Sequence, residues 1–446
     1  MNRPKPKHRI IGGIEASMEN IGASFFVVKL TNSILLYYQK MSNMAYLKQL
    51  ITSIVLMAIC ASAEGQIIFS DSTQISILTC SMGADSYERF GHTGVRINDL
   101  KNGQDIVFHW GVYDFDEPCF VLKFIKGITD YQIGACYTSD FIRQYKRRGL
   151  GMKEQKLNLD SKQRTQAIAA ILDNYRPENR KYRYNFFFDN CSTRPFDVIN
   201  AATDNAIEYD TTWVKPITLR DMLQEKTSKN NWLDFGISLA VATRSDQKAS
   251  FGEQMFLPDY LMKAYDNATI GGRKLVEEKK LLLETTPETQ ERIDDKTVLL
   301  SPNVVFSALL IFVVIIVIGA RTNKSKITVM MVKATACIIL ASSGITGSII
   351  WFLNFFSLHP AVDHNVNCLW LLPTNIIFAV LIWVKSAEKV NRIYFFIIFA
   401  LIFAYAIINN MIIHQYINPA FWPLLGALIV MSGHHLLDNR HEEELS

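Results

Sequence analysis

The stretch YNFFFDNCSTRPF, residues 184–196, marks the point where a strand-like aromatic pattern gives way to a helical one. Residues 181–188 are predicted as a strand, and Pro195 suits the first turn of a helix, where its missing N–H leaves no bond unmade. Cys191, between these two elements, therefore stands at a helix N-terminus. Free backbone N–H groups and the positive end of the helix dipole favour a thiolate there, so we predict Cys191 as a nucleophile.

A second stretch, RFGHTGVR at residues 89–96, places His92 at the start of a strand-like run. A nearby imidazole can hold a thiolate as an ion pair and later return its proton, so we predict His92 as the base for Cys191. Small residues around His92 leave the backbone accessible to a substrate. The alternative is a structural pair, with a buried or disulfide-bonded cysteine and a histidine that has no chemical role.

Strand and helix signals around these motifs indicate an α+β domain. Residues 75–79 are strand-like, and residues 94–97 and 105–113 form a predicted hairpin with Asn-Gly at its turn. Residues 163–175 carry apolar side chains at helical spacing. The hairpin places residues 110–113 opposite the start of the first strand, so we predict that His109 orients the imidazole of His92. A strand histidine without this role is the alternative.

Polar and charged side chains flank both motifs and are candidates for binding a substrate. Asn185 or Asn190 donates a hydrogen bond to an oxyanion in one interpretation and caps a turn in the other. Asp189 is a weaker candidate for orienting the histidine. Arg96 and Arg194 are predicted to bind a phosphate headgroup through bidentate hydrogen bonds, and solvated or ion-paired arginine is the alternative.

The C-terminal part of the chain, residues 302–446, has the pattern of an all-α membrane domain with five transmembrane helices. Its apolar stretches are 303–320, 329–356, 369–384, 393–413 and 420–437. A helix that crosses a bilayer needs roughly 17–25 such residues, and the third stretch is the shortest. Lys and Arg follow the first, third and fifth stretches, whereas the opposite loops 357–368 and 414–419 contain neither. The N-terminal domain and these loops are therefore predicted outside the cytoplasm, and the C-terminus inside it.

The loop SLHPAVDHNVN, residues 357–367, lies on the same predicted side as Cys191 and is rich in hydrogen-bonding groups. We predict that His359 and Asn367 line a headgroup site, with a merely hydrated loop as the alternative. A metal site built from His359, Asp363 and His364 is a weaker alternative, because nothing in the sequence fixes its geometry. We therefore predict no bound metal and no cofactor.

Composition excludes several classes of function. The net charge of +4 is small and scattered, and no nucleic-acid motif or glycine-rich phosphate loop is present, so no nucleic-acid partner is predicted. None of the seven cysteines forms a CxxC pair, which disfavours zinc and iron–sulfur sites. If Cys191 is a free nucleophile, Cys80, Cys119 and Cys136 leave one cysteine without a disulfide partner in an exported domain.

The N-terminus has the pattern of an export signal. Residues 41–63 combine a lysine, a short apolar run and Ala-Ser-Ala, which predicts a cleaved signal peptide. Residues 1–40 precede this signal, so we interpret them as an upstream extension from a misassigned start. An exported domain over 64–270 follows, and the highly charged residues 271–301 are predicted as a helical or partly disordered linker to the membrane domain.

Several motifs together carry a resemblance to a known family. They are FGHTG (90–94), GVYDFD (111–116), TDY (129–131), YNFFFDNC (184–191) and LPDYL (257–261). This set resembles the Lnb N-terminal periplasmic domain. His359-Pro360 and NCLW (367–370), with five apolar stretches, resemble the membrane half of the same family. The resemblance extends from about residue 66 to residue 437.

The resemblance implies a lipoprotein N-acyltransferase of the cytoplasmic (inner) membrane, with its N-terminal domain in the periplasm. Such an enzyme moves an acyl chain from a membrane phospholipid, through a thioester on Cys191, to the α-amino group of diacylglyceryl-cysteine lipoproteins. The order of His92 before Cys191 also resembles circularly permuted papain-like folds of the NlpC/P60 group. Two other functions stay open: a membrane-anchored thiol hydrolase acting on peptidoglycan or lipid esters, and a non-catalytic membrane-anchored binding protein.

Overall fold

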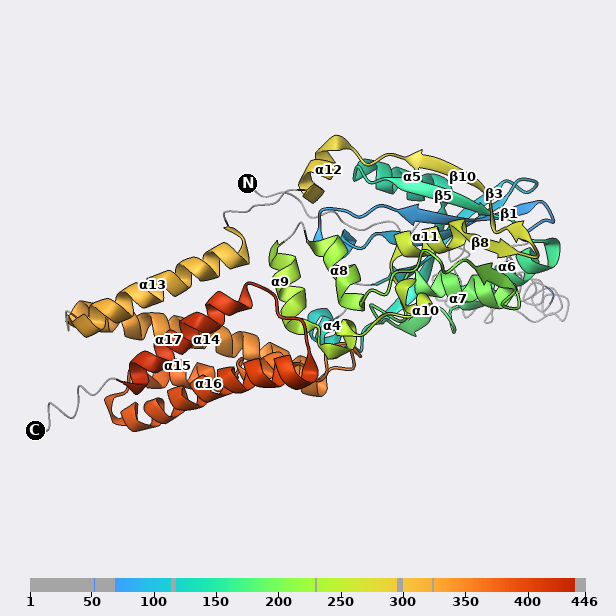
Figure 1. Cartoon of the computed structure of the whole chain (residues 1–446). Helices are drawn as coiled ribbons and strands as arrows, with labels where there is room; N and C mark the ends of the chain where they lie inside the picture. The colour runs from blue at the N-terminus through green and yellow to red at the C-terminus, as the bar shows by residue number, and fades with distance from the viewer. Residues whose placement is uncertain are drawn as a thin grey trace, which may run out of the picture.

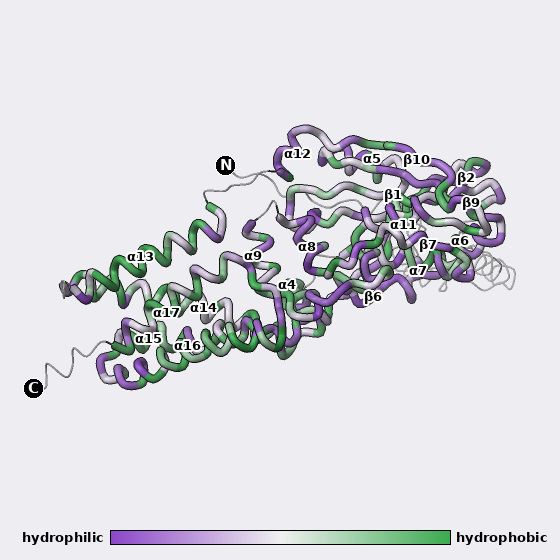
Figure 2. The backbone as a smooth tube through the Cα atoms, in the orientation of Figure 1, coloured by the Kyte–Doolittle hydropathy of each residue, from purple (hydrophilic) through white to green (hydrophobic). Residues whose placement is uncertain are grey.

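The computed structural model describes residues 52, 69–113, 118–228, 231–294, 300–322 and 325–437. The predicted signal peptide and upstream extension lie outside these residues, apart from Thr52. Figure 1 shows a sheet-containing N-terminal domain joined end to end with a bundle of helices. The hydropathy colouring of Figure 2 changes at the same place, with long hydrophobic helices on one side of the junction. The predicted order of an α+β domain followed by a helical domain is confirmed.

Two antiparallel sheets form the framework of the N-terminal domain. The larger has seven strands in the order β10-β5-β1-β2-β3-β4-β6, and the smaller has the order β7-β8-β9. The strands are β1 (Thr73–Cys80), β2 (His92–Asp99), β3 (Gln104–Val112), β4 (Asp130–Tyr137), β5 (Met152–Leu157), β6 (Lys181–Arg183), β7 (Ile207–Tyr209), β8 (Ala268–Ile270), β9 (Arg273–Lys274) and β10 (Val276–Leu283).

Helices cover both faces of the larger sheet. They are α4 (Phe120–Lys126), α5 (Thr138–Arg147), α6 (Ser161–Tyr175), α7 (Thr193–Ala202), α8 (Leu219–Thr227), α9 (Asn231–Ala240), α10 (Phe251–Gln254), α11 (Pro258–Asp266) and α12 (Pro287–Asp294), with 3-10 turns at Ser86–Glu88 and Thr243–Asp246. Successive residues of a strand point to opposite faces, so Phe108 packs in the cluster with α6, α7 and α11. Its neighbour Val107 packs in the cluster with Phe141 of α5.

The predicted hairpin and helix are confirmed. Strands β2 and β3 pair with Gly94 opposite His109, and Asp160 caps α6 in a capping box with Gln163. Such a box satisfies backbone N–H groups that the first helical turn leaves unpaired. The aromatic run 181–188 is a strand only over β6, because the following turn closes on itself through paired hydrogen bonds between Asn185 and Asp189.

The predicted linker over 271–301 is wrong in its first part. Strand β10 pairs with β5 from Val276 to Leu283 and forms an edge of the larger sheet. Four of its eight side chains are exposed and charged, which is a common protection of edge strands against aggregation. The same charges made the segment resemble a solvated linker in the sequence. Residues 295–299 of this range lie outside the described residues.

The helical domain consists of α13 (Pro302–Thr322), α14 (Lys326–Phe356), α15 (Asn375–Leu381), α16 (Glu388–Ile408) and α17 (Phe421–Leu436), with short turns at Val366–Leu369, Lys385–Ala387 and Asn409–Ile413. Within the described residues, three helices are long and apolar enough to cross a membrane: Pro302–Thr322, Lys326–Phe356 and the continuous stretch Lys385–Ile413. Helix α17 is apolar but shorter, and the third apolar stretch of the sequence contains only the short helix α15.

Two glycines of α14 let the irregular chain before α15 pack backbone to backbone. A Cβ atom at Gly347 would lie 2.5 Å from the carbonyl oxygen of Leu371, and one at Gly344 would lie 2.6 Å from the nitrogen of Ile376. Asn375 donates to Ser343 at 2.9 Å and accepts from Tyr394 at 2.5 Å. Irregular backbone at membrane depth is tolerated only where it is buried in protein, and these contacts bury it.

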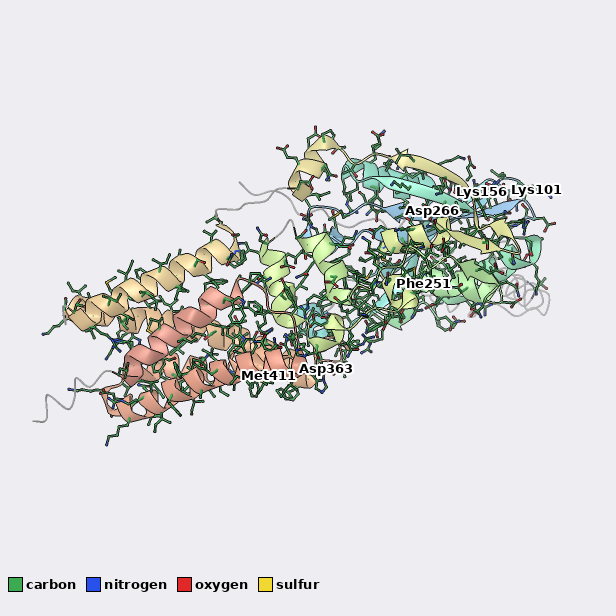
Figure 3. The ribbon with its side chains drawn as sticks, viewed as in Figure 1. Lys101, Lys156, Phe251, Asp266, Asp363 and Met411 are labelled. Carbon is green, nitrogen blue, oxygen red and sulfur yellow. The ribbon has the colours of Figure 1, made fainter. Side chains whose placement is uncertain are left out.

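A hydrogen-bonded joint connects the two domains. The backbone N–H of Ala242 donates to the carbonyl of Ala361 at 2.7 Å, and Asn365 donates to the carbonyl of Leu239 at 2.7 Å. Leu239, at the end of α9, belongs to the apolar core of the helical domain. Asp363, labelled in Figure 3, lies at this junction. The loop 357–368 is therefore the structural connection between the domains.

Candidate active site

An asparagine turn fixes Cys191 in front of α7. The Asn190 side-chain oxygen accepts from the backbone N–H of Ser192 at 2.7 Å and of Thr193 at 3.0 Å. These bonds satisfy the first donors of the helix and define where it starts. Ser192 is the N-cap residue, so Cys191 lies one position before the N-cap and two before the first residue of the helix. The predicted placement of the cysteine at a helix start is confirmed.

His92 and Cys191 converge on a single glycine. A Cβ atom added at Gly111 would lie 3.7 Å from the Cβ of Cys191 and 3.8 Å from Cε1 of His92. Gly111 has a φ of +96°, a conformation that other residues rarely adopt. It follows His109 at a register shift in the pairing of β3 with β4. The fold thus brings the two residues predicted as nucleophile and base together across a bulge.

His109 contacts His92 directly. The Nδ1 atom of His109 lies 3.1 Å from the Nε2 atom of His92, and the two rings meet edge to face with centroids 5.1 Å apart. This contact leaves Nδ1 of His92 as the ring nitrogen available to Cys191. If Nε2 of His92 carries the proton, it donates to His109, and Nδ1 is then a proton acceptor. The predicted proximity of His109 to His92 is confirmed, and the orienting role of His109 stays a prediction.

Burial keeps the site electrically neutral. Burial raises the pKa of the Cys191 thiol to about 11, although backbone hydrogen bonds from Thr93 and from Cys191 itself oppose the rise. The pKa of His92 is lowered well below 6.5, first by burial and then by the charges of His109 and Arg148. Burial also lowers the pKa of His109 to about 4. At neutral pH the pair is a thiol and a neutral imidazole.

This neutral state corrects the prediction of a resting thiolate. Tyr145, Tyr182 and Tyr184 are buried near Cys191, and a thiolate there would contribute to raising the pKa of each of them. These aromatic rings keep water away, and the loss of solvation outweighs the favourable field at the start of α7. His92 must therefore remove the proton while the thiol reacts.

The polar residues beside Cys191 hold the turn together. The Asn185 side-chain oxygen accepts from the backbone N–H groups of Phe187 and Phe188, both at 3.1 Å. The side-chain N–H₂ group of Asn190 donates to the carbonyls of Phe186 and Phe256 at 2.8 and 2.9 Å. The Asn190 amide is thus committed to the turn through both its oxygen and its N–H₂ group. The oxygen of Asn185 also caps the turn, and an oxyanion role for its N–H₂ group stays a prediction.

The arginines and Asp189 are also paired within the domain. Arg194 forms a bidentate ion pair with Asp189 at 2.5 and 2.7 Å and lies over the ring of Tyr182. Arg96 binds both oxygens of Asp105 at 2.7 Å and also Glu154 at 2.9 Å. The guanidinium groups of both arginines are therefore ion-paired, so the alternative interpretation applies to them rather than the predicted contact with a headgroup. Neither Asp189 nor its partner contacts the imidazole in the described hydrogen bonds.

The loop residues predicted to bind a headgroup have structural partners. Asn367 is fully buried; it donates to the carbonyl of Leu239 at 3.3 Å and accepts from Trp370 at 3.1 Å. The His359 ring donates to the carbonyl of Phe124 at 2.7 Å. Asn367 is therefore part of the joint between domains, not an open headgroup site. Among the described residues, no group of three metal-ligating side chains is found.

The sequence did not single out some residues that shape the site. Gly111 was only part of a motif, and its role depends on a positive φ and on two side chains that approach it from other elements. Thr93 contributes through its backbone N–H, which no residue type reveals. One signal in the sequence could have indicated the role of Gly111: it directly follows His109 and Trp110, two strand residues with large rings. Of the six cysteines described, none is in a disulfide.

Comparison with models of protein families shows to which family the chain is related. The model of the Lnb N-terminal periplasmic domain matches residues 66–226, and that of the Lnb transmembrane domain matches residues 294–442. The chain belongs to the Lnb family. Members of this family carry a periplasmic domain in front of a transmembrane domain, so this Lnb protein is a membrane protein with a periplasmic N-terminal domain. Family membership suggests a part in lipoprotein biogenesis. No match was found among curated proteins or among solved structures.

Proposed function

We propose that this Lnb protein is a lipoprotein N-acyltransferase of the cytoplasmic (inner) membrane. It takes an acyl chain from a membrane phospholipid and transfers it to the α-amino group of diacylglyceryl-cysteine lipoproteins. The observation that carries the proposal is the convergence of Cys191 and His92 on Gly111 in a periplasmic domain that is joined to a membrane bundle. A thiol nucleophile at this place meets two substrates that are both anchored in the bilayer.

In the first half-reaction, Nδ1 of His92 accepts the proton of the Cys191 thiol while the sulfur attacks the carbonyl carbon of a phospholipid ester. A tetrahedral intermediate forms, and its collapse breaks the ester C–O bond. The protonated His92 gives its proton to the departing lysophospholipid oxygen. The products are an acyl thioester on Cys191 and a lysophospholipid, and the imidazole is neutral again.

In the second half-reaction, the neutral α-amino group of the lipoprotein attacks the thioester carbonyl. An α-amino group has an ordinary pKa of about 7.7–8.0, so a useful fraction is neutral near pH 7. His92 takes the proton that the nitrogen loses and returns it to the departing sulfur of Cys191. An amide forms, the C–S bond breaks, and the free thiol is restored.

The surroundings of the pair support both steps. The backbone N–H groups of Thr93 and Cys191 are the donors next to the sulfur, so we assign them to the oxyanion of each tetrahedral intermediate. His109 holds the imidazole of His92 in the tautomer that leaves Nδ1 free to accept a proton. Because His109 is itself neutral, it positions the ring without adding a charge to the site.

Packing against the membrane domain supports a lipid substrate. Phe187, in the turn that carries Cys191, lies in the same apolar cluster as Ala361 of the loop between membrane helices. The site therefore has a fixed position relative to the membrane helices. We further propose that α15 with its irregular lead-in and the short helix α17 complete five crossings, and that the N-terminal fold is the permuted papain-like arrangement.

The test is to trap the acyl-enzyme. The purified protein in phospholipid nanodiscs, without lipoprotein, should carry one acyl chain on the peptide that contains Cys191, and hydroxylamine should remove it. Addition of a diacylated lipopeptide with a free N-terminus should move the chain to the lipopeptide. Cys191→Ala should abolish both signals, whereas Cys136→Ala should retain them. Release of free fatty acid whether or not lipopeptide is present would instead identify a hydrolase.

A further inference from the structure

Helix α4 exposes apolar side chains although it belongs to the periplasmic domain. Val121, Leu122 and Phe124 are 65%, 67% and 41% exposed. No residue of this seven-residue helix is fully buried. Scattered single apolar residues are normal at a protein surface, but three within four positions of one helix form a patch that needs a partner.

Direct hydrogen bonds attach α4 to the end of the membrane helix α14. The Ser357 hydroxyl donates to the carbonyl of Ile125 at 2.7 Å, and the backbone N–H of Leu358 donates to the carbonyl of Lys126 at 2.9 Å. The side chain of Ile125 packs against the apolar core of the membrane domain. Figure 1 shows α4 at the junction between the two domains. The helix is therefore held at the level where α14 leaves the bilayer.

The exposed patch of α4 continues the lipid-facing surface of the membrane domain. Phe355, Phe356 and Leu358, at the end of α14, are each at least 60% exposed. They precede or belong to the segment that binds α4. The last turn of α4 also carries the basic residue Lys126, whose charge suits the phosphates of a bilayer surface. A short apolar helix with basic residues at this height fits the bilayer interface.

We infer that α4 is an interfacial helix, which inserts Val121, Leu122 and Phe124 into the periplasmic surface of the phospholipid bilayer. The occupant is lipid rather than protein, because the patch is fixed by backbone hydrogen bonds at the end of a membrane helix and continues that helix's apolar exposure. The helix thus tethers the periplasmic domain at a further point, besides the joint of α9 with the loop 357–368 and the covalent connection to α13.

A ladder of aromatic rings leads from α4 to the nucleophile. Phe120 of α4 stacks on Tyr113 with ring centroids 5.5 Å apart, and Tyr113 stacks on Tyr131 at 4.8 Å. Tyr131 stacks on Tyr184 at 4.1 Å, and Tyr184 lies near enough to Cys191 for a thiolate there to contribute to raising its pKa. The row of ring contacts leads from the inserted helix towards the site, so a lipid held at α4 lies at the end of this row opposite the thiol. This last step rests on the proposed function.

Photo-crosslinking tests the insertion without any need for turnover. A photoreactive phenylalanine analogue replaces Leu122 in the full chain, in nanodiscs of phosphatidylethanolamine and phosphatidylglycerol. Irradiation should give a protein–phospholipid adduct, measured by intact mass. The matched control is Leu100, which is 61% exposed in the β2–β3 turn. Its neighbour Lys101 lies at the end of the domain farthest from the membrane helices (Figure 3). The analogue at Leu100 should give severalfold less adduct.

A second position protects the test against a local folding defect. The analogue at Val121 should also give the lipid adduct, with the analogue at Leu100 again as its control. Equal lipid adducts at test and control positions, or adducts of 121 and 122 only with protein, would overturn the inference. The same adducts are expected in the Cys191→Ala background, so a failure of the acyltransferase proposal would leave this result unchanged.

Discussion

At the scale of single residues, the site works through neutrality rather than charge. The field at the start of α7 favours a thiolate, but burial among tyrosine rings raises the pKa of Cys191 to about 11. The neutral His92 beside it compensates, because an imidazole with a lowered pKa is ready to accept a proton at all pH values above that pKa. A buried, uncharged thiol is also protected from adventitious oxidation, which requires thiolate character.

The resting protonation state can be measured by alkylation. The thiolate fraction of a thiol with a pKa of about 11 rises about tenfold per pH unit below that value, so labelling of Cys191 by iodoacetamide should rise steeply between about pH 7 and 9. Mass spectrometry of the Cys191 peptide in a Cys119→Ala background gives the rate. A rate that is already at its plateau near pH 7 would indicate a thiolate–imidazolium pair instead.

His109 is predicted to be a positioning residue for His92. His109→Asn keeps a side-chain acceptor for the Nε2–H of His92, so it should retain acyl transfer within about tenfold of the native rate. His109→Leu removes that acceptor and should lower kcat by about 10²-fold or more, with little change in KM. Steady-state transfer to a diacylated lipopeptide measures both. Equal losses in the two variants would mean that the ring of His109 matters for packing alone.

At the scale of elements, sequence patterns predicted the parts that are locally determined. The β2–β3 hairpin and α6 carry their own turn and cap signals, and both were predicted near their true ends. Strand β10 was missed because its place in the sheet depends on β5, more than a hundred residues earlier, and its own side chains are charged. The loop 357–368 was taken for an open site because its polar groups gave no sign of their buried partners in α9.

The close packing of α14 against the irregular chain before α15 gives a prediction at this scale. Gly347→Ala places a methyl group 2.5 Å from the Leu371 carbonyl oxygen, so the two backbones must separate. We expect a loss of about 1–3 kcal/mol in the free energy of unfolding of the membrane domain. Gly433→Ala in α17 is the matched control, because nothing lies within 4 Å of its added Cβ. Unfolding of both variants in mixed micelles compares them; equal stability would contradict the packing.

At the scale of the whole molecule, the two domains are one functional unit. The site residues His92, His109 and Cys191 could be predicted from their motifs, but their relation to the membrane could not. That relation depends on α4, α9 and the loop 357–368, which meet only in the folded chain. In the proposed reaction, a thioester formed at a fixed place beside the bilayer meets a second membrane-anchored substrate without leaving the surface, so the proposal requires the joint as well as the nucleophile.

The two buried histidines predict how the stability of the periplasmic domain depends on pH. Burial lowers the pKa of His92 well below 6.5 and that of His109 to about 4, so both take up protons more readily in the unfolded chain. The stability is therefore fully present above about pH 6.5 and decreases as the pH falls below that value. Thermal unfolding of the native protein and of His109→Asn should show a weaker acid dependence in the variant; identical profiles would exclude the coupling.

The joint itself can be weakened without touching the site. Asn365 donates to the carbonyls of Leu239 and Ala240 at 2.7 and 3.2 Å, and it accepts from Gln415 at 3.1 Å. Asn365→Ala removes this partner from the Ala240 carbonyl and the Gln415 amide and leaves the Leu239 carbonyl only its bond from Asn367. The cost is about 1–3 kcal/mol, and the change should loosen the periplasmic domain on the membrane bundle. Hydrogen exchange in α9 should then increase, and transfer from bilayer phospholipid should fall.

The exposed Asn410 is the matched control for this change, because its side chain bonds only to the preceding turn of its own helix, at the Ala406 carbonyl. Asn410→Ala should change neither exchange in α9 nor transfer. Native exchange in α9 of Asn365→Ala would show that this side chain does not hold the joint. Loosened exchange with normal transfer would show that the reaction needs no fixed joint at α9, and that the connection to α13 and the contacts of α4 are sufficient to keep the thiol at the bilayer.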